Sequence, residues 1–331
     1  MWDPDLIFDT SKNYFTEHVG ERVLAPTWGG YKDMKEIPLS LSYLQEAKRA
    51  GMKITPLLHN DFDLQETKKL LHDSGAVQNL ARQITATALV YDFDGWNLDF
   101  ENMDEADKFL YTKFIKTVSE KLHMHGKEIS VDVTVNSNSP NWSLCYDRKG
   151  MAAYVDYEVI MGYDQTPGGS RYSGPVSSYS WLKHHIAMLL KQVPNNKLVL
   201  GLPFYTRVWT GKEGQAASSV LMTKQIKSLL GQNNVGLFWN PEDRQYVGIW
   251  EENGQTRKVW LEERRSLQEK VSLAHDYKLA GLAFWRYGFE TEDIYDQIEG
   301  AFLNKKDESV RYKNRSEDIL IKFRERLKRA Q

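Results

Sequence analysis

The segment 91–102 has the alternation of a β-strand with one polar and one apolar face. Because successive side chains of a strand point to opposite faces, Asn97, Asp99 and Glu101 share one face and the apolar residues between them share the other. An exposed edge strand would show the same alternation with its polar face in water. Two carboxylates two residues apart on one face repel each other, which raises the proton affinity of one of them. This property suits general acid catalysis, which needs a carboxylic acid that stays protonated near neutral pH.

Seven other segments have the composition of strands, and helical spacing of apolar residues separates most of them. These segments are 23–28, 52–58, 128–135, 155–164, 197–203, 257–262 and 279–285. Eight strands that alternate with helices predict an α/β fold, a parallel (β/α)8 TIM barrel. The longer interval 211–255 contains a short helical segment and a hairpin turn at Asn253-Gly254. We expect it to form a small α+β insertion on the barrel rim between strands 6 and 7.

Bulk properties favour some classes of protein over others. The net charge of −2 gives no electrostatic reason to expect nucleic acid or an anionic membrane as a partner. The single cysteine, Cys145, cannot form an internal disulfide. No stretch approaches the roughly 18–20 apolar residues of a membrane span. Ten Trp and seventeen Tyr suit a sugar-binding cleft or an aromatic-rich core equally well.

Motifs for other chemistries are missing from the sequence. It contains no His-Glu-x-x-His zinc motif, no Gly-x-x-x-x-Gly-Lys phosphate loop and no Gly-x-Ser-x-Gly nucleophile elbow. We therefore expect neither a metal nor a cofactor. The first residues lack the basic and apolar regions of a signal peptide, which taken literally predicts a cytosolic protein.

The segment around Glu101 resembles the signature strand of glycoside hydrolase family 18, Asp-x-x-Asp-x-Asp-x-Glu. Asp94, Asp99 and Glu101 match three of its acidic positions, whereas Asn97 stands at the second. Bacterial members that resemble spore-cortex and cell-wall enzymes often read Asp-Gly-x-Asn-x-Asp-Phe-Glu, so the resemblance points to the branch of cell-wall N-acetylglucosaminidases and chitinases. We expect Asn97 to leave one negative charge fewer beside Asp99 and less repulsion when Asp99 ionises.

Further family motifs fall where barrel enzymes place their chemistry, at the carboxyl ends of predicted strands. Met161-Gly162-Tyr163-Asp164 resembles the fifth-strand motif, the segment 201–209 the sixth, and 283–286 the eighth. A lone Tyr-Asp is more often a turn and a lone buried Trp more often core, but the motifs occur in the family's order. His59 also ends a predicted strand, where a cleft position and a structural role are equally open.

The resemblance implies substrate-assisted retaining catalysis, in which the 2-acetamido oxygen of the substrate acts as the nucleophile. Glu101 would protonate the leaving oxygen and later activate water, Asp99 would bind the acetamido nitrogen and stabilise the oxazolinium, and Tyr163 would position the acetamido oxygen. The candidate substrate-binding residues are Asp94, Asn97, Trp28, Asp164, Tyr205, Arg207 and Trp285.

The implied partner is a β-linked N-acetylglucosamine polysaccharide. Peptidoglycan is favoured, and chitin and N-linked glycan cores remain open. The resemblance implies a bacterial protein that is secreted and associated with the cell wall or spore. A lectin-like member of the same barrel family without turnover is the main alternative, although such members usually lack the acid at the position of Glu101. A scaffold assembled through its tail is a third interpretation.

The domain organisation follows from a change of composition after Phe302. A helix at 291–302 is expected to close the barrel, so that residues 1–303 form one family 18-like catalytic domain. Residues 304–331 are predicted to form a charged tail that is helical, because some of its apolar side chains have helical spacing. They are Ile319, Leu320, Phe323 and Leu327. The sequence leaves open whether this helix packs on the barrel, on another subunit or on another domain.

Overall fold

The structure, a computed structural model, describes residues 22–34, 41–233, 235–291, 294 and 298 of the 331-residue chain. The chain divides into two compact units, which we describe separately. Of the described residues, the barrel unit contains those up to Gly162, His184–Gly201 and Tyr277–Ala283, and the insertion unit contains Tyr163–Lys183, Leu202–Asp276 and those from Phe284 onward.

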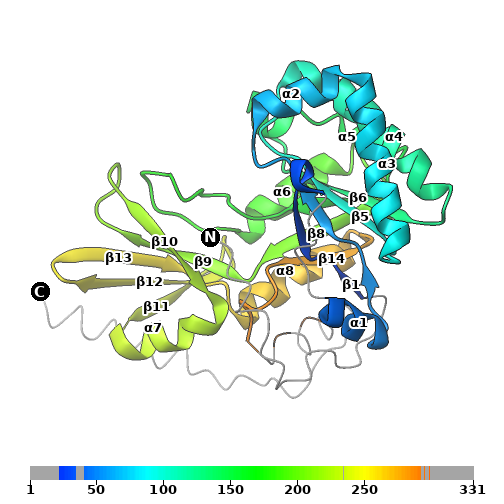
Figure 1. Ribbon diagram of the computed structural model, residues 1–331. Helices are drawn as coiled ribbons and strands as arrows, with labels where there is room; N and C mark the ends of the chain where they lie inside the picture. Colours follow the sequence, from blue (N-terminus) through cyan, green and yellow to red (C-terminus); the bar gives the residue numbers. More distant parts are fainter. Residues whose placement is uncertain (1–21, 35–40, 234, 292–293, 295–297, 299–331) are drawn as a thin grey trace, which may run out of the picture. The chain divides into compact units, whose positions relative to one another are not determined.

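A seven-stranded sheet in the order β14-β8-β7-β6-β5-β4-β2 is the centre of the barrel unit (Figure 1). From β2 to β8, each strand pairs in parallel with its neighbour. The strands are β2 (Thr27–Gly30), β4 (Leu57–His59), β5 (Gly95–Asp99), β6 (Glu128–Thr134), β7 (Tyr157–Met161), β8 (Leu198–Pro203) and β14 (Gly281–Trp285). The alternation of parallel strands with helices is the TIM-barrel class of fold that the sequence predicts.

The first two predicted strands are each divided in two. β1 (Val23–Leu24) and β3 (Lys53–Ile54) form a separate parallel pair ahead of β2 and β4. Each break contains a proline, Pro26 or Pro56, which has no N–H to donate to a neighbouring strand.

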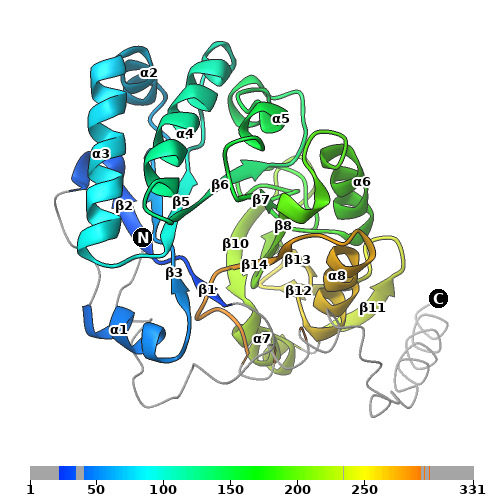
Figure 2. The ribbon, with the colours of Figure 1, turned by 90° about the vertical axis from the view of Figure 1, so that its right-hand side faces the viewer.

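Helices lie outside the sheet and close its apolar face. Figure 2 shows α3 and α4 side by side over β5 and β6. Trp96, Leu98 and Phe100 are fully buried on the helix side of β5, and the Trp96 indole N–H donates to the Ile84 carbonyl of α3 at 2.9 Å. The helices preceding the insertion are α1 (Leu41–Arg49), α2 (Leu64–His72), α3 (Ser74–Val90), α4 (Lys108–His123), α5 (Arg148–Met151) and α6 (Tyr179–Leu189).

The insertion unit is built on a five-stranded antiparallel sheet in the order β10-β9-β13-β12-β11. Its strands and helices are β9 (Tyr205–Thr210), β10 (Ala217–Met222), α7 (Ile226–Asn233), β11 (Gly236–Asn240), β12 (Gln245–Glu252), β13 (Gln255–Trp260) and α8 (Arg264–Asp276). The predicted hairpin is confirmed: β12 and β13 are joined by Asn253 and Gly254, whose φ values of 52° and 72° are those a two-residue hairpin turn requires.

The prediction that the segment 257–262 forms the seventh barrel strand is wrong. Most of the segment belongs to β13, which pairs antiparallel with β12 and with β9, where Val259 lies opposite Val208. The Asn253-Gly254 turn sends the chain back along β12, so the alternating residues that follow join the insertion sheet rather than the parallel one. The insertion therefore includes β9 and β13 and is larger than the predicted interval 211–255.

Several predictions concern residues outside the described ranges. The tail at 304–331, with its Ile319, Leu320, Phe323 and Leu327, lies wholly outside them, as does the domain boundary at 303. The closing helix at 291–302 lies largely outside them. Within the described part of the chain, no helix combines the length and apolar character needed to cross a bilayer.

Candidate active site

β5 carries the polar residues of the candidate site. Asn97 and Asp99 lie on the face opposite the core residues, and Glu101 follows two residues after the strand ends. Gly95 allows β6 to approach closely, because a Cβ at this position would lie 2.3 Å from the Glu128 carbonyl oxygen. The sequence prediction for the alternation of this strand is confirmed.

Asn97 is directed toward the neighbouring strand β6. Its Nδ2 donates to Ser130 Oγ at 3.0 Å and to Asp132 Oδ1 at 2.9 Å, and the residue is only 5% exposed. Both N–H groups of the amide are therefore used within the protein. Asp132 of β6 places a buried carboxyl group against the Asn97 amide. The expectation of less charge repulsion at Asp99 stays a prediction.

Asp99 has an environment that favours its protonated form. Burial raises the pKa of Asp99 to about 7, and its Oδ1 atom has no hydrogen-bond partner among the described residues. Burial also raises the pKa of Asp132, with a further contribution from the charge of Asp99, while the hydrogen bond from Asn97 lowers it. Two adjacent carboxyl groups with raised pKa values hold a proton near neutrality. On the other side of Asp99 the strand pairing places His59 of β4.

The backbone of Glu101 is held by Asn60, which follows β4. Glu101 N–H donates to Asn60 Oδ1 at 3.0 Å, and Asn60 Nδ2 donates to the Glu101 carbonyl at 2.7 Å. Asn60 is 1% exposed and also donates to Thr67 Oγ1 at 2.9 Å. The hydroxyl of Tyr146 donates to the Phe100 carbonyl at 2.9 Å. Asn60 is not recognisable as a site residue from the sequence, because an asparagine after a strand has the same local pattern as a loop residue.

Two exposed aromatic rings lie near the backbone that follows Glu101, Phe62 in the segment after β4 and Trp142 in the short π-helix Pro140–Leu144. Phe62 and Trp142 are 56% and 42% exposed, and their ring centroids are 6.0 Å apart. Asn102, directly after Glu101, donates from Nδ2 to the Phe62 carbonyl at 2.8 Å, and Asn141 Nδ2 donates to Asn102 Oδ1 at 3.4 Å. Neither ring is recognisable as a site residue from the sequence, because the two come together from segments about 80 positions apart.

The insertion unit brings four predicted site residues together. Asp164 Oδ1 accepts hydrogen bonds from the Tyr205 hydroxyl at 2.9 Å and from Arg207 Nη2 at 3.2 Å. The ring of Tyr163 lies edge-on to that of Tyr205, with centroids 6.3 Å apart. Burial and the nearby Asp164 charge raise the pKa of Tyr205 far above its ordinary value. Tyr205 is therefore a neutral donor that, with Arg207, fixes the Asp164 carboxylate.

Trp285 ends β14 and is 38% exposed. Its carbonyl accepts a hydrogen bond from Phe204 N–H at 2.7 Å. The ring of the preceding Phe284 stacks on that of Phe204 at a centroid distance of 4.6 Å. The backbone that carries the exposed indole is thus tied to the residue preceding β9.

Two predicted substrate-binding residues lie elsewhere. Trp28 is 3% exposed, and its ring packs 5.6 Å from those of Phe93 and Trp96, within the core beneath the helices. Asp94 precedes β5, at the end opposite to Glu101, where its Oδ2 accepts the Ile54 N–H at 2.8 Å. These placements correct both predictions: Trp28 fills the core, and Asp94 joins two strands.

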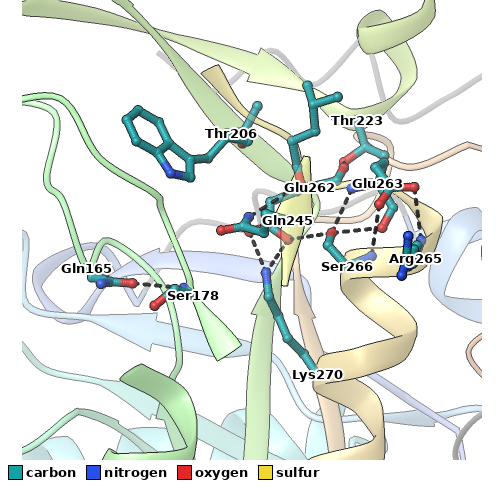
Figure 3. Close-up of polar contacts among 12 residues, drawn as sticks. Gln165, Ser178, Thr206, Thr223, Gln245, Glu262, Glu263, Arg265, Ser266 and Lys270 are labelled. Atoms are coloured by element: carbon teal, nitrogen blue, oxygen red, sulfur yellow. Dashed lines mark hydrogen bonds and ion pairs between the residues drawn. The ribbon is translucent and has the colours of Figure 1, made fainter. Parts of the chain in front are cut away.

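A buried ion pair supports the strand that carries Tyr205 and Arg207 (Figure 3). Lys270 of α8 and Glu262 have no exposed surface, and Lys270 Nζ lies 2.6 and 2.5 Å from the two Glu262 carboxylate oxygens. Gln245 Nε2 donates to Glu262 Oε1 at 2.6 Å. The Thr206 hydroxyl, between Tyr205 and Arg207 on β9, donates to the Trp260 carbonyl. The cluster thus links α8, β12 and the end of β13 beside β9.

Carboxyl groups at the carboxyl end of a parallel barrel strand are groups that glycosidases use in catalysis. The chain belongs to glycosyl hydrolases family 18, whose family model matches residues 40–290. It is 26% identical over 265 residues to an uncharacterized glycosylase, YvbX, of Bacillus subtilis, covering 77% of this chain and 76% of that protein. It is also 26% identical to the cortical fragment-lytic enzyme of B. subtilis, over 72% of this chain but only 56% of that enzyme.

Solved structures share the fold. The spore cortex-lytic enzyme SleL of Bacillus megaterium matches with a TM-score of 0.78 and 21% identity, over 91% of this chain and 71% of that one. A chitinase of Chromobacterium violaceum matches with a TM-score of 0.74 and 21% identity, over 80% and 84% of the two chains.

Proposed function

We propose that this chain hydrolyses β-linked N-acetylglucosamine polymers, with the glycan strands of peptidoglycan as the favoured substrate and chitin as the second candidate. The observation that carries the proposal is the end of β5, where a raised pKa of about 7 for Asp99 adjoins the firmly held backbone of Glu101. The names of the cortex-lytic relatives support peptidoglycan, and that of the chitinase with the same fold supports chitin.

The proposed mechanism is substrate-assisted retention. Glu101 gives its proton to the leaving glycosidic oxygen while the substrate's acetamido oxygen attacks the anomeric carbon, and the oxazolinium forms. Asp99 accepts the acetamido N–H as a carboxylate and faces the positive charge. Glu101 then takes a proton from the water that opens the ring. Tyr163 positions the acetamido oxygen, which lowers the entropic cost of attack.

Residues of the insertion unit are proposed to bind the reacting sugar. Asp164, held by Tyr205 and Arg207, offers a carboxylate to sugar hydroxyls, and the exposed indole of Trp285 offers a flat apolar surface. We add the exposed rings of Phe62 and Trp142 as a stacking surface for a further sugar of the polymer. In keeping with such a substrate, the protein is proposed to act on the cell wall or spore.

A lectin-like function without turnover is the alternative. The presence of Glu101 favours hydrolysis, because sugar binding alone does not need a proton donor at the strand end. Release of reducing ends from purified peptidoglycan and from chitin oligomers decides between them. We expect release from peptidoglycan; binding of either glycan without release would favour the lectin function.

Asn60 is expected to position the catalytic acid. Asn60→Asp keeps the acceptor for the Glu101 N–H but removes the donors to the Glu101 carbonyl and to Thr67. Misplacement of a catalytic group lowers kcat more than it changes KM, and we expect a fall of about 10–100-fold in kcat. Steady-state kinetics measure the effect. Tyr146→Phe, which removes a hydrogen bond to the preceding carbonyl, is the matched variant and should lose less activity; an equal loss in both would argue against a special role for Asn60.

A further inference from the structure

Asp132 of β6 is a second buried carboxyl group in the candidate site. It lies outside the family signature, which covers residues 94–101 around β5. In the parallel pairing of β5 with β6, Asn97 lies opposite Ser130 and Leu98 opposite Val131. The next step of this register sets Asp99 beside Asp132. Neighbouring strands are about 4.8 Å apart, and side chains at one level point to the same face. Asp99 and Asp132 therefore form a cross-strand pair of carboxyl groups.

Asn97 holds one member of this pair. Its amide donates to Asp132 Oδ1 at 2.9 Å and to Ser130 Oγ at 3.0 Å, which uses both of its N–H groups. The hydrogen bond keeps the Asp132 carboxyl group at the level of Asp99. Both N–H groups of Asn97 are thus used within the protein, one of them on the Asp132 carboxyl group.

Titratable groups of neighbouring elements surround the pair, and one of them is the buried phenol of Tyr146, whose pKa is raised by burial and, to a smaller extent, by the charge of Asp99. On the side of β4, His59 lies beside Asp99 in the pairing, but its Nδ1 is 3.1 Å from the Asp61 carboxylate. From α4, the buried Tyr111 phenol experiences both charges, and after burial the charge of Asp99 is the largest cause of its raised pKa. None of these groups supplies a fixed positive charge between the two carboxyl groups, so two negative charges there would repel each other with little screening.

We propose, on the basis of the proposed hydrolase function, that Asp132 is a positioning residue that shares one proton with Asp99. When Glu101 protonates the leaving oxygen, the shared proton moves from an oxygen of Asp99 to an oxygen of Asp132. One O–H bond breaks, one forms, and the charge of the pair is unchanged. Asp99 then faces the acetamido N–H and the oxazolinium as a full carboxylate, and Asp132 retains the proton until the product leaves.

The test compares the wild type with D132N and with N97D/D132N. The amide in D132N keeps an acceptor oxygen for Asn97 but has no acid proton to share. The double variant returns a carboxyl group to the face of β5 that holds Asp99. We expect D132N to lower kcat by about 10–100-fold with little change in KM, and the double variant to recover at least about fivefold of that loss. Glu120→Gln, the same carboxyl-to-amide change on the exposed face of α4, is the matched control and should keep kcat within about threefold of the wild type.

The pH dependence gives a readout that a purely structural role would not move. In the wild type, both Glu101 and the carboxyl pair lose a proton on the alkaline limb of kcat/KM. D132N lacks the ionisation of the pair, so its alkaline limb should become shallower. Its melting temperature at pH 8 should equal or exceed that of the wild type, because the substitution removes a buried acid. A much lower melting temperature would show that the fold needs this carboxyl group and would overturn proton sharing.

The failures of the two proposals are distinguishable. A wild-type protein that cleaves neither peptidoglycan nor chitin oligomers contradicts the proposed function. Wild-type cleavage together with an unchanged kcat and pH profile in D132N contradicts only the role of Asp132. The same holds if N97D/D132N is no faster than D132N.

Discussion

Glu101→Gln is expected to abolish hydrolysis while sugar binding survives. The two side chains have nearly the same shape, but an amide neither donates an acid proton to the leaving oxygen nor takes one from water. General acid–base groups contribute about 10²–10⁴-fold to a rate, and Glu101 is proposed to act in both steps, so kcat should fall by at least that factor. Reducing-end release measures turnover, and titration calorimetry with the same oligosaccharide measures binding.

Glu120→Gln is the matched control for this experiment. Glu120 lies on the exposed face of α4, where its carboxylate is 3.8 Å from Lys116. The same change of charge at this position should leave turnover at the wild-type level. Comparable turnover in Glu101→Gln and the wild type would rule out Glu101 as the acid. Loss of binding together with turnover would instead indicate that the substitution disturbs the site.

Lys270→Met is expected to produce the largest loss of stability. It leaves the Glu262 carboxyl group buried without its ammonium partner, a change that typically costs about 3–5 kcal/mol. The cost depends on pH. Burial raises the pKa of Glu262 to about 7 even beside Lys270, and it rises further without the amine. An unfolded glutamate titrates near about 4.3. The folded variant therefore binds a proton that the unfolded chain releases. Its stability should decline as the pH increases from the unfolded pKa of about 4.3 through the raised pKa of folded Glu262.

Urea unfolding followed by tryptophan fluorescence at pH 5 and pH 8 measures this effect. The companion variant Glu262→Gln/Lys270→Met removes both charges and keeps an oxygen that can accept from Gln245. We expect it to recover at least half of the lost free energy of unfolding at pH 8. If Lys270→Met is as stable as the wild type at both pH values, the ion pair contributes nothing to stability. A loss of stability that is larger at pH 5 than at pH 8 would contradict the pH dependence expected from the raised pKa of Glu262.

The parts of the fold that depend on local pattern could be predicted from the sequence. The alternation around Asp99 identified β5, and Asn253-Gly254 identified the hairpin, because a two-residue turn with positive φ needs these residue types. The error at 257–262 has a physical reason. Alternation of apolar and polar residues is the same in a parallel and an antiparallel sheet, and the choice of partner strand depends on residues far away in the sequence.

The parts of the candidate site that cross between strands could not be predicted. Asn60 contacts Glu101 across 41 positions of the chain, and Asn97 contacts Asp132 across 35. Nothing local marks either contact, because each follows from which strands are neighbours and from their register. Conversely, Asp94 belongs to the family signature and Trp28 ends a predicted strand, and both were expected to bind substrate. Side-chain direction and strand end decide that placement, and both are tertiary properties.

The hydrogen bond between Asn97 and Asp132 also bears on how such chains are sorted by their motifs. A search that demands an acid at every signature position along one strand would score this chain as degenerate, and a degenerate signature is commonly taken to mean a lost activity. The register of β5 and β6 shows that an acid two positions further along the adjacent strand can reach the same place. We expect the carboxyl groups that surround Asp99 in space to separate active from inactive members better than the residue types along the signature strand do.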